Sequence, residues 1–510
     1  MGVLSNNILT IIEPTIELDA FEIPDIESGN IDGDNASDRN KKGPNVSKIA
    51  GGNFPSVRIN EYDFNQNDIL FFNLIIGESF LPELRVSVED SKGVFSLSQY
   101  PKDGDVLSLY IRSTDEEVYK PIRMDFDIIN VDAPPVNNQS QAAPPDNDVD
   151  PAVDPIIFTF ECRVKIPGLF KEVCQSYNND TSFNHLLNVA DELNIGFASN
   201  ITDTSDEMNR IIAYDTLYRF INNTTKTSYK TDNHFFTSYI DPYYYLNFVD
   251  VNNQLKYDNQ LEETLVSLID SLDELGTDTD VETIGEGKLF LTNLDKGVTG
   301  TSRYINAYSL QGSPAEVTLQ NGYKRVLQYY DSNDKEYRQF DINPLISENL
   351  PDDLYPLRGR QDEQRFKEEI KYKYMGKQSS NTHENYHFAK LHNRQNIVEL
   401  NKMYMRVELE TANMSLYTMQ KIPLIIYETN EKRINALNQR EDKNRDNGTP
   451  RANDVSDIAD NNTVNYGAPK LNQFLTGTYV IGSIEYIYTR GMSSIKQNLK
   501  MLRREWPQRI

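Results

Sequence analysis

A strictly alternating segment at residues 156–168, IIFTFECRVKIPG, is the feature that most limits what this chain can fold into. Its even-numbered residues from Ile156 to Ile166 are apolar, whereas four of the five residues between them are polar or charged. A period of two is typical of a β-strand with one buried and one wet face, and Pro167-Gly168 predicts its end. The pattern recurs upstream and near the C-terminus, so we expect two antiparallel β units, each a barrel or a sandwich.

The two predicted β units share one plan, in which strands are followed by a long polar insertion and then by closing strands. The alternating segments of the first unit are 72–76, 84–88, 107–111, 122–128 and 156–166, and those of the second are 403–409, 422–428, 476–489 and 493–506. The last of these would also fit a helix with Ile495, Leu499 and Leu502 on one face. A Pro-rich loop at 133–154 interrupts the first set, and an Asn- and Asp-rich loop at 429–472 interrupts the second. This number of antiparallel strands predicts closed or nearly closed β domains.

Between the β units the hydrophobic period changes to that of helices. Thr181-Ser182 predicts the start of a helix that ends near Gly196, and residues 208–222 also have a helical pattern. The aromatic segment 234–252 is predicted to return to strands, and a further helix is expected at 384–401. The sequence therefore predicts an α+β protein of several domains.

Charge and cysteine content exclude several classes of protein. The chain has 51 basic and 77 acidic residues and a net charge of −26, which disfavours a surface that binds nucleic acid or anionic membrane. The two cysteines, Cys162 and Cys174, make no disulfide framework, and Cys162 is expected to be a buried thiol, which fits a reducing compartment. We expect no membrane anchor, because no run of 18 apolar residues occurs, and the first residues do not have the pattern of a secretory signal.

One motif carries possible chemistry. His383-Glu384-Asn385-Tyr386-His387 fits H-E-x-x-H, in which two histidines one helical turn apart bind zinc and the glutamate is the general base. The motif would lie at a helix N-terminus, its middle residues are not apolar, and the sequence points to no third ligand. The competing interpretation is a helix that packs Tyr386, Phe388 and Leu391 while its histidines are hydrogen-bonded or solvated. We predict no catalytic, cofactor or metal residues, and keep a zinc peptidase with His383, Glu384 and His387 as an alternative.

Three segments resemble the central baseplate hub protein of contractile-tailed bacteriophages, a family related to the hub portion of type VI secretion spike proteins. They are FLPELRVSVEDSKGVFSLSQYPKDGDVLSLYIRS (80–113), LRGRQDEQRFKEEIKYKYMGKQ (357–378) and the run from His383 to Glu428. The resemblance implies two tail-tube-like antiparallel β-barrels per chain, separated by smaller α/β domains. The domains expected from it are an arm and linker (1–52), a first tube-like barrel (53–167), a small α/β domain (168–255), an acidic insertion (256–300), a second α/β domain with a connecting helix (301–400) and a second tube-like barrel (401–510).

The resemblance also implies a non-enzymatic function. Three chains would form a ring of six barrels that joins a sixfold tail tube to a threefold central spike, within the baseplate of a virion assembled in the host cytoplasm. Expected partners are two further copies, the tail tube protein, the central spike protein and baseplate wedge proteins, and DNA would pass through without specific binding. Asp125, Asp127 and Glu161 are candidates for the channel lining, and the segment 239–248 and Trp506 for subunit contacts. A peripheral adhesin is a further alternative, because long polar loops and 30 tyrosines would suit one.

Overall fold

The computed structural model describes most of the predicted strands and helices. The described residues are 8–19, 53–60, 62–64, 66–90, 93, 104–113, 121–133, 156–255, 289–291, 304–312, 324–342, 370–378, 381–401, 403–409, 412–414, 416–428, 470–471, 475–492 and 494–503. Nearly all of the long loops at 133–154 and 429–472, most of the acidic insertion and Trp506 lie outside them. Within the described part of the chain, no helix has the length and apolar character needed to cross a membrane.

The first β unit has seven strands, all paired antiparallel. They are β2 (Asn53–Ile59), β3 (Tyr62–Phe64), β4 (Ile69–Ile76), β5 (Glu83–Asp90), β6 (Val106–Ser113), β7 (Ile122–Asp132) and β8 (Ile156–Val164), and their order in the sheet is β4-β5-β8-β7-β6-β2-β3. A short 3-10 helix, η2 (Gln66–Asp68), precedes β4. The alternation in β8 has the predicted effect, because Phe158, Phe160 and Val164 are fully buried and Glu161 is exposed. Cys162 is buried as predicted, and burial raises the pKa of its thiol.

The second β unit also has seven strands. They are β14 (Leu289–Leu291), β15 (Tyr304–Gly312), β19 (Met403–Leu409), β20 (Lys421–Glu428), β21 (Lys470–Leu471), β22 (Gly477–Thr489) and β23 (Lys496–Leu502). Their order is β21-β20-β14-β15-β19-β23-β22, and β20 pairs with β22 as well. The strand pairing can therefore be followed from β20 through β14, β15, β19, β23 and β22 and back to β20. Two strands of this unit, β14 and β15, lie before the boundary that the sequence predicts at residue 401.

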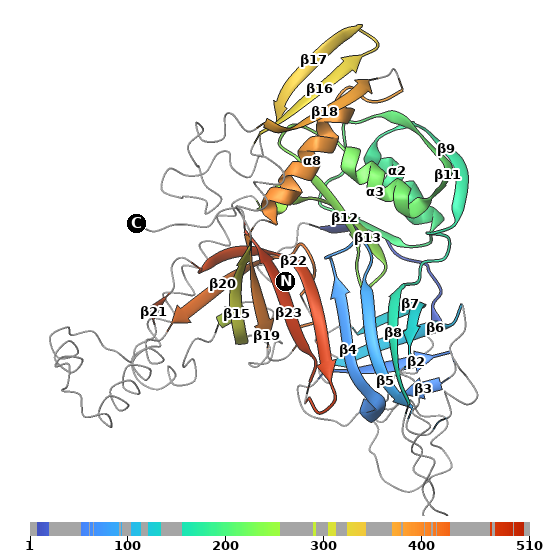
Figure 1. Cartoon of the computed structure of the whole chain (residues 1–510), viewed down its shortest axis with the longest axis vertical. Coiled ribbons are helices and arrows are strands. Elements are labelled where there is room, and N and C mark those ends of the chain that lie inside the picture. The colour runs from blue at the N-terminus through green and yellow to red at the C-terminus, as the bar shows by residue number, and fades with distance from the viewer. Residues whose placement is uncertain are drawn as a thin grey trace, which may run out of the picture.

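A single strand pair joins the two units into one sheet of 14 strands (Figure 1). Strands β4 and β22 run antiparallel, with Ile76 opposite Ile484 and Phe71 opposite Thr489. Phe72 and Leu74 of β4 and Tyr486 of β22 are buried on the same side of this pair, so the core of one unit continues into the other.

Two smaller groups of elements lie above the large sheet in Figure 1. The first group contains β1 (Leu9–Ile12), β10 (Gly196–Ser199), β12 (Phe236–Ile240) and β13 (Tyr245–Asp250) in one sheet, the two-stranded ribbon of β9 (Glu172–Asp180) and β11 (Met208–Thr216), and helices α2 (Ser182–Glu192), α3 (Leu217–Thr227) and α4 (Val251–Leu255). The second group contains β16 (Lys324–Asp331), β17 (Glu336–Ile342) and β18 (Ile370–Gln378) with helix α8 (Tyr386–Leu400). The chain is thus multidomain and β-rich with large antiparallel sheets, as predicted.

The predicted helix at 208–222 is wrong over its first half. Residues 208–216 form β11, and the helix begins at Leu217. Met208, Arg210 and Ile212 point into the core while Asn209 and Ile211 are exposed, which is the period of a strand. Pairing with β9 therefore decides the structure of a segment whose apolar residues also suit a helix.

Candidate functional site: the polar face of the large sheet

One face of the large sheet is polar across both β units. We call it the polar face; its charged and amide residues are Asn73, Glu83, Arg85, Glu89, Asn130, Asp132, Glu161, Arg163, Arg406, Glu408, Glu485, Lys496, Asn498 and Lys500. The register places these side chains in adjoining rows: Glu161 lies opposite Arg85, Arg85 opposite Asn73, and Glu485 opposite Asn498. All of them are exposed or half-buried.

Glu485 is the centre of this face, beside the junction between the units. Its carboxylate accepts hydrogen bonds from the amides of Asn73 at 3.0 Å and Asn498 at 2.9 Å, and from the guanidinium of Arg406 at 2.5 Å. One carboxylate thus links β4 of the first unit to β19 and β23 of the second. Next to it, the ammonium of Lys496 donates to Glu408 at 3.0 Å.

The face mixes charges of both signs, and several of them are paired. Arg490 donates to Glu89 across the units, because the two residues belong to β5 and to the turn that follows β22. Lys500 lies over the ring of Tyr404 at 4.8 Å, and burial lowers the pKa of its ammonium. Several charges of this face are therefore engaged with other residues of the same chain.

Two of the three residues predicted to line a channel are exposed, and one is not. Asp127 and Glu161 are exposed, whereas Asp125 is 1% exposed. Ser108 Oγ donates to Asp125 at 2.6 Å, and the main-chain N–H of Asp125 donates to the hydroxyl of Tyr244 at 2.7 Å. The prediction for Asp125 is therefore wrong, because the loop before β13 covers this end of β7. Burial also raises the pKa of the Asp125 carboxyl.

The H-E-x-x-H motif does not lie on one helix. Helix α8 begins at Tyr386, so His383 precedes it while His387 is in its first turn. His383 donates through Nε2 to the carbonyl oxygen of Thr227 at 3.0 Å, and Glu384 is exposed. The ring of His387 lies 5.5 Å from that of Tyr329. The residues therefore follow the packing interpretation, and among the described residues no three His, Cys, Asp or Glu side chains gather as metal ligands would.

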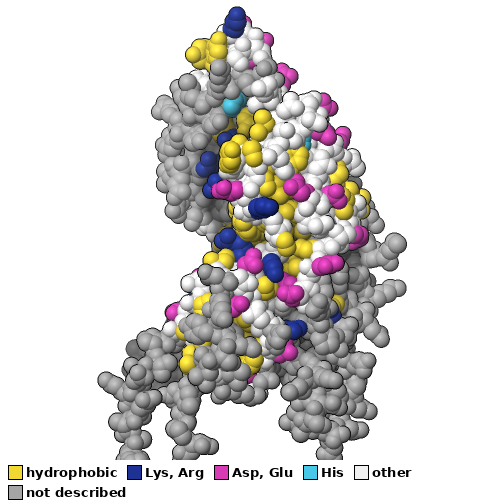
Figure 2. Space-filling view, turned by 90° about the vertical axis from the view of Figure 1, so that its right-hand side faces the viewer, with side chains coloured by type: hydrophobic (Ala, Val, Ile, Leu, Met, Phe, Trp, Pro, Cys, Tyr) yellow, Lys and Arg dark blue, Asp and Glu magenta, His cyan; other side chains and the backbone are white. Residues whose placement is uncertain are grey.

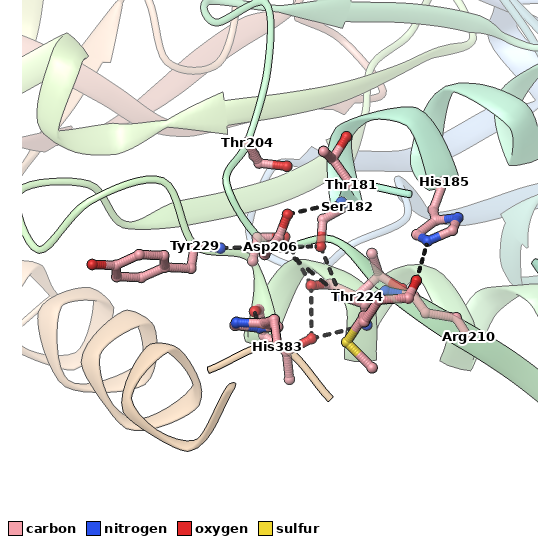
Figure 3. Close-up of polar contacts among 12 residues, drawn as sticks. Thr181, Ser182, His185, Thr204, Asp206, Arg210, Thr224, Tyr229 and His383 are labelled. Carbon is pink, nitrogen blue, oxygen red and sulfur yellow. Dashed lines mark hydrogen bonds and ion pairs between the residues drawn. The ribbon is translucent and has the colours of Figure 1, made fainter. Parts of the chain in front are cut away.

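A buried polar cluster that the sequence analysis missed holds the α/β region together (Figure 3). Asp206 is fully buried and accepts hydrogen bonds from the main-chain N–H of Ser182 at 2.9 Å and of Tyr229 at 3.1 Å. Its carboxylate also accepts from the Ser182 hydroxyl and lies 3.9 Å from the guanidinium of Arg210. Arg210 donates to Ser182 Oγ at 2.7 Å and to Thr227 Oγ1 at 3.1 Å.

This cluster connects the two α/β groups. Because His383 donates to Thr227, the segment before α8 is fixed to the C-terminal end of α3. Asn393 of α8 adds a hydrogen bond to the carbonyl oxygen of Ser228 at 2.9 Å. The one local signal in the sequence was Thr181, which caps α2 as predicted by accepting from the N–H of Asn184 at 3.3 Å. Asp206, in contrast, lies in a loop whose composition does not reveal its burial.

No family model and no curated protein sequence matches the chain. Solved structures do match, at low identity. A 43 kDa tail protein of prophage MuSo2 from Shewanella oneidensis has a TM-score of 0.42 at 10% identity, over 89% of this chain and 98% of that chain. A tail protein from Neisseria meningitidis has a TM-score of 0.42 at 7% identity, over 88% of this chain and 96% of that chain.

A component of the type VI secretion system of E. coli is similar too. Its TM-score is 0.36 at 8% identity, over 87% of this chain and 76% of that chain, and it is described as similar to tail proteins of bacteriophage T4. The chain is therefore similar to phage tail and type VI secretion proteins, the class that its sequence resembles.

Proposed function

We propose that this chain is the hub subunit of a contractile phage tail, in which three copies form a pseudo-sixfold ring. The ring joins the sixfold tail tube to the threefold central spike, and it leaves a channel through which DNA passes without specific binding. The proposal is of a structural and non-enzymatic protein in the tail baseplate, assembled in the host cytoplasm. Its expected partners are the tail tube protein, the central spike protein and baseplate wedge proteins.

The observation that carries this proposal is the junction of β4 with β22. It places two seven-stranded antiparallel units edge to edge in one chain, with their polar sides on a common face. If neighbouring chains paired edge to edge in the same head-to-tail way around a closed ring, each contact would add one more β unit to the ring. Two units per chain and a threefold axis give six units, the number needed to continue a sixfold tube.

Each β unit is proposed to be a tail-tube-like barrel. In support, the strand pairing of the second unit runs β20-β14-β15-β19-β23-β22 and then returns from β22 to β20. The first unit is proposed to extend over 53–167, and the second to comprise 401–510 together with β14 and β15. The two α/β domains are proposed to lie outside the ring wall, because residues of each α/β domain cover one end of the strands of the large sheet.

The polar face is the proposed channel lining. Its six carboxylates and five cations would largely neutralise one another through pairs such as Arg406 with Glu485, so phosphate would meet no continuous row of cations. Asp127 and Glu161, which are both exposed, remain proposed residues of this lining.

The oligomeric state tests the proposal directly. Multi-angle light scattering of the purified full chain should give a trimer, and cryo-electron microscopy of the particle should place it on the tail axis between tube and spike. A monomer at all accessible concentrations and no axial location would overturn the proposal. Density at the tail periphery would instead favour the adhesin.

A further inference from the structure

A cavity of about 350 Å³ lies beside the β4–β22 junction, and we call it the junction pocket. Ile76 of β4 and Ile484 of β22, which lie opposite each other in that strand pair, are among its lining residues. The turn from β12 to β13 and the segment 414–418 line it as well, so the two β units and the first α/β group meet there (Figure 1). The volume is within the usual range for sites that bind small ligands.

The lining of the junction pocket is mainly aliphatic and aromatic. Its aliphatic side chains include residues of β4, β7, β22 and the segment 414–418, and its five tyrosines are Tyr239, Tyr243, Tyr245, Tyr417 and Tyr486. Burial raises the pKa of the phenols of Tyr239 and Tyr243, so these side chains stay uncharged. Because aromatic rings in offset or edge-to-face contact gain energy beyond the burial of apolar area, the lining favours an aromatic ligand over an aliphatic one of the same size.

Only one charged side chain, Asp241, is among the described lining residues. Its carboxylate accepts hydrogen bonds from the N–H of Tyr243 at 2.8 Å, the N–H of Tyr245 at 3.0 Å and the amide of Asn247 at 3.0 Å. On the face of the molecule in Figure 2, in contrast, hydrophobic side chains lie among acidic and basic ones. An anion in the pocket would meet no lining Lys or Arg, and a cation would compete with three donors for the carboxylate, so the pocket favours an uncharged ligand.

Thr418 adds a polar group to the lining. Its side chain is buried, with 2% of the residue exposed, and its hydroxyl has no hydrogen-bond partner among the described residues. Its carbonyl oxygen, in contrast, accepts from the hydroxyl of Tyr239 at 2.8 Å. Since a buried hydroxyl without a partner is costly, a ligand that offers a hydrogen bond at this position would bind more tightly than one that does not.

We propose that the junction pocket binds an uncharged aromatic ring that carries a hydroxyl or carbonyl group, which forms a hydrogen bond with the hydroxyl of Thr418. The ring would pack among the five tyrosines. Because it would contact Ile76 of one β unit and Ile484 of the other, a bound ligand would also stabilise the junction. The inference does not depend on a tail location, because it rests on the pocket alone.

NMR titration of the full chain with matched small probes tests the ligand class. Benzyl alcohol is the uncharged aromatic probe, benzylamine and benzoate have the same size with a positive and a negative charge, and cyclohexylmethanol has no aromatic ring. We expect benzyl alcohol to bind at millimolar concentration, the two charged probes to bind about tenfold more weakly or not at all, and cyclohexylmethanol to bind more weakly too.

A further probe identifies the source of the ring. N-acetylphenylalanine amide presents an aromatic side chain between two peptide groups. If it binds as tightly as benzyl alcohol, the ring can belong to a side chain of a partner protein; if it is excluded, the pocket takes free small molecules.

Variants of the protein localise the site. Thr418→Val removes the hydroxyl at nearly constant volume and should weaken binding of benzyl alcohol by about fivefold, while binding of toluene stays the same. The matched control is Thr224→Val in α3, because Thr224 is also buried and its hydroxyl also lacks a partner among the described residues. Ala198→Leu should fill the pocket and abolish binding, whereas Ala213→Leu, at an exposed position of β11, should not. Circular dichroism establishes that each variant is folded.

Several results would overturn the proposal. They are the absence of benzyl alcohol binding, equal or tighter binding of a charged probe, equal binding of cyclohexylmethanol, and binding that persists in folded Ala198→Leu. Equal losses in Thr418→Val and Thr224→Val would also overturn it. If the chain were not a trimer but bound benzyl alcohol as described, the trimer proposal would fail and this one would stand.

Discussion

Asn73 and Glu485 are 412 positions apart in the sequence, yet the amide of Asn73 donates a 3.0 Å hydrogen bond to the carboxylate of Glu485. The contact crosses the β4–β22 junction, where the two β units meet. Because Arg406 and Asn498 donate to the same carboxylate, Glu485 couples the junction to two further strands. The stability of the junction should therefore depend on this one acidic residue.

Replacing Glu485 tests this dependence. Glu485→Ala removes the common acceptor of three donors, and we expect it to reduce the free energy of unfolding by about 1–2 kcal/mol. Glu485→Gln keeps an acceptor and should cost less. Urea unfolding followed by circular dichroism measures the free energy of unfolding of each variant. Glu336→Ala, at an exposed site of β17, is the control; equal effects of Glu336→Ala and Glu485→Ala would show that the contacts at the junction contribute nothing.

Replacing Asp206 should destabilise the protein far more than replacing Glu485, because the loss of Asp206 leaves the guanidinium of Arg210 buried without a counter-ion. Asp206→Ala is expected to destabilise the α/β region by about 3–5 kcal/mol, and Asp206→Asn by less. The matched control is Asp203→Ala in the same loop, which breaks an exposed pair with Lys230 at 2.6 Å and should cost under about 1 kcal/mol. Thermal unfolding monitored by calorimetry distinguishes them, and similar shifts for Asp206→Ala and Asp203→Ala would contradict the role of the cluster.

Some features of this structure can be predicted from the sequence and others cannot. The alternation in 156–166 predicted β8 because burial of one face leaves a local signature. Asp206 and the β4–β22 pair have no such signature, since their partners come from distant segments. Asp125 was expected on the wet face by its period, but Tyr244 covers it from another domain. At 208–222 the apolar residues suit both a helix and a strand, and only the pairing with β9 decides between them.

His392 should make stability depend on pH. It is buried beside Phe388 in α8, and burial lowers the pKa of its ring to about 4. In the unfolded chain a histidine takes up its proton near pH 6.5, so acid favours the unfolded state between pH 6.5 and 4. Above pH 6.5, protonation of His392 should not affect the free energy of unfolding. As the pH falls from 6.5 toward 4, that free energy should decrease by an amount on the order of 3 kcal/mol.

Unfolding midpoints measured across this range test the expectation. Relative to the natural chain, His392→Gln should unfold with a shallower dependence on pH between 6.5 and 4. An unchanged slope in His392→Gln would refute the prediction.

Gly196 should control how the N-terminal strand docks. A Cβ at this position would lie 2.4 Å from the ring of Tyr245 and 3.0 Å from Pro14, so any larger residue forces both apart. We expect Gly196→Val to cost about 1–3 kcal/mol and to release residues 8–19 from β10. Limited proteolysis should then cleave this segment faster, whereas Ala307→Val at an exposed position of β15 should not change the rate. Unchanged protection would show that the strand docks independently of this contact.

The histidine motif yields the last prediction. If His383 serves to fix the start of α8 to α3 through Thr227, then His383→Ala should lower stability by about 1–2 kcal/mol, because a buried carbonyl loses its donor. His383→Gln, whose amide can still donate, should recover part of that loss. Elemental analysis of the natural chain should find no stoichiometric zinc, and addition of zinc should not raise its melting temperature, since His383 lies outside the helix that carries His387. Tight zinc binding that is lost in both His383→Ala and His387→Ala would restore the peptidase hypothesis and displace the packing role argued for the motif.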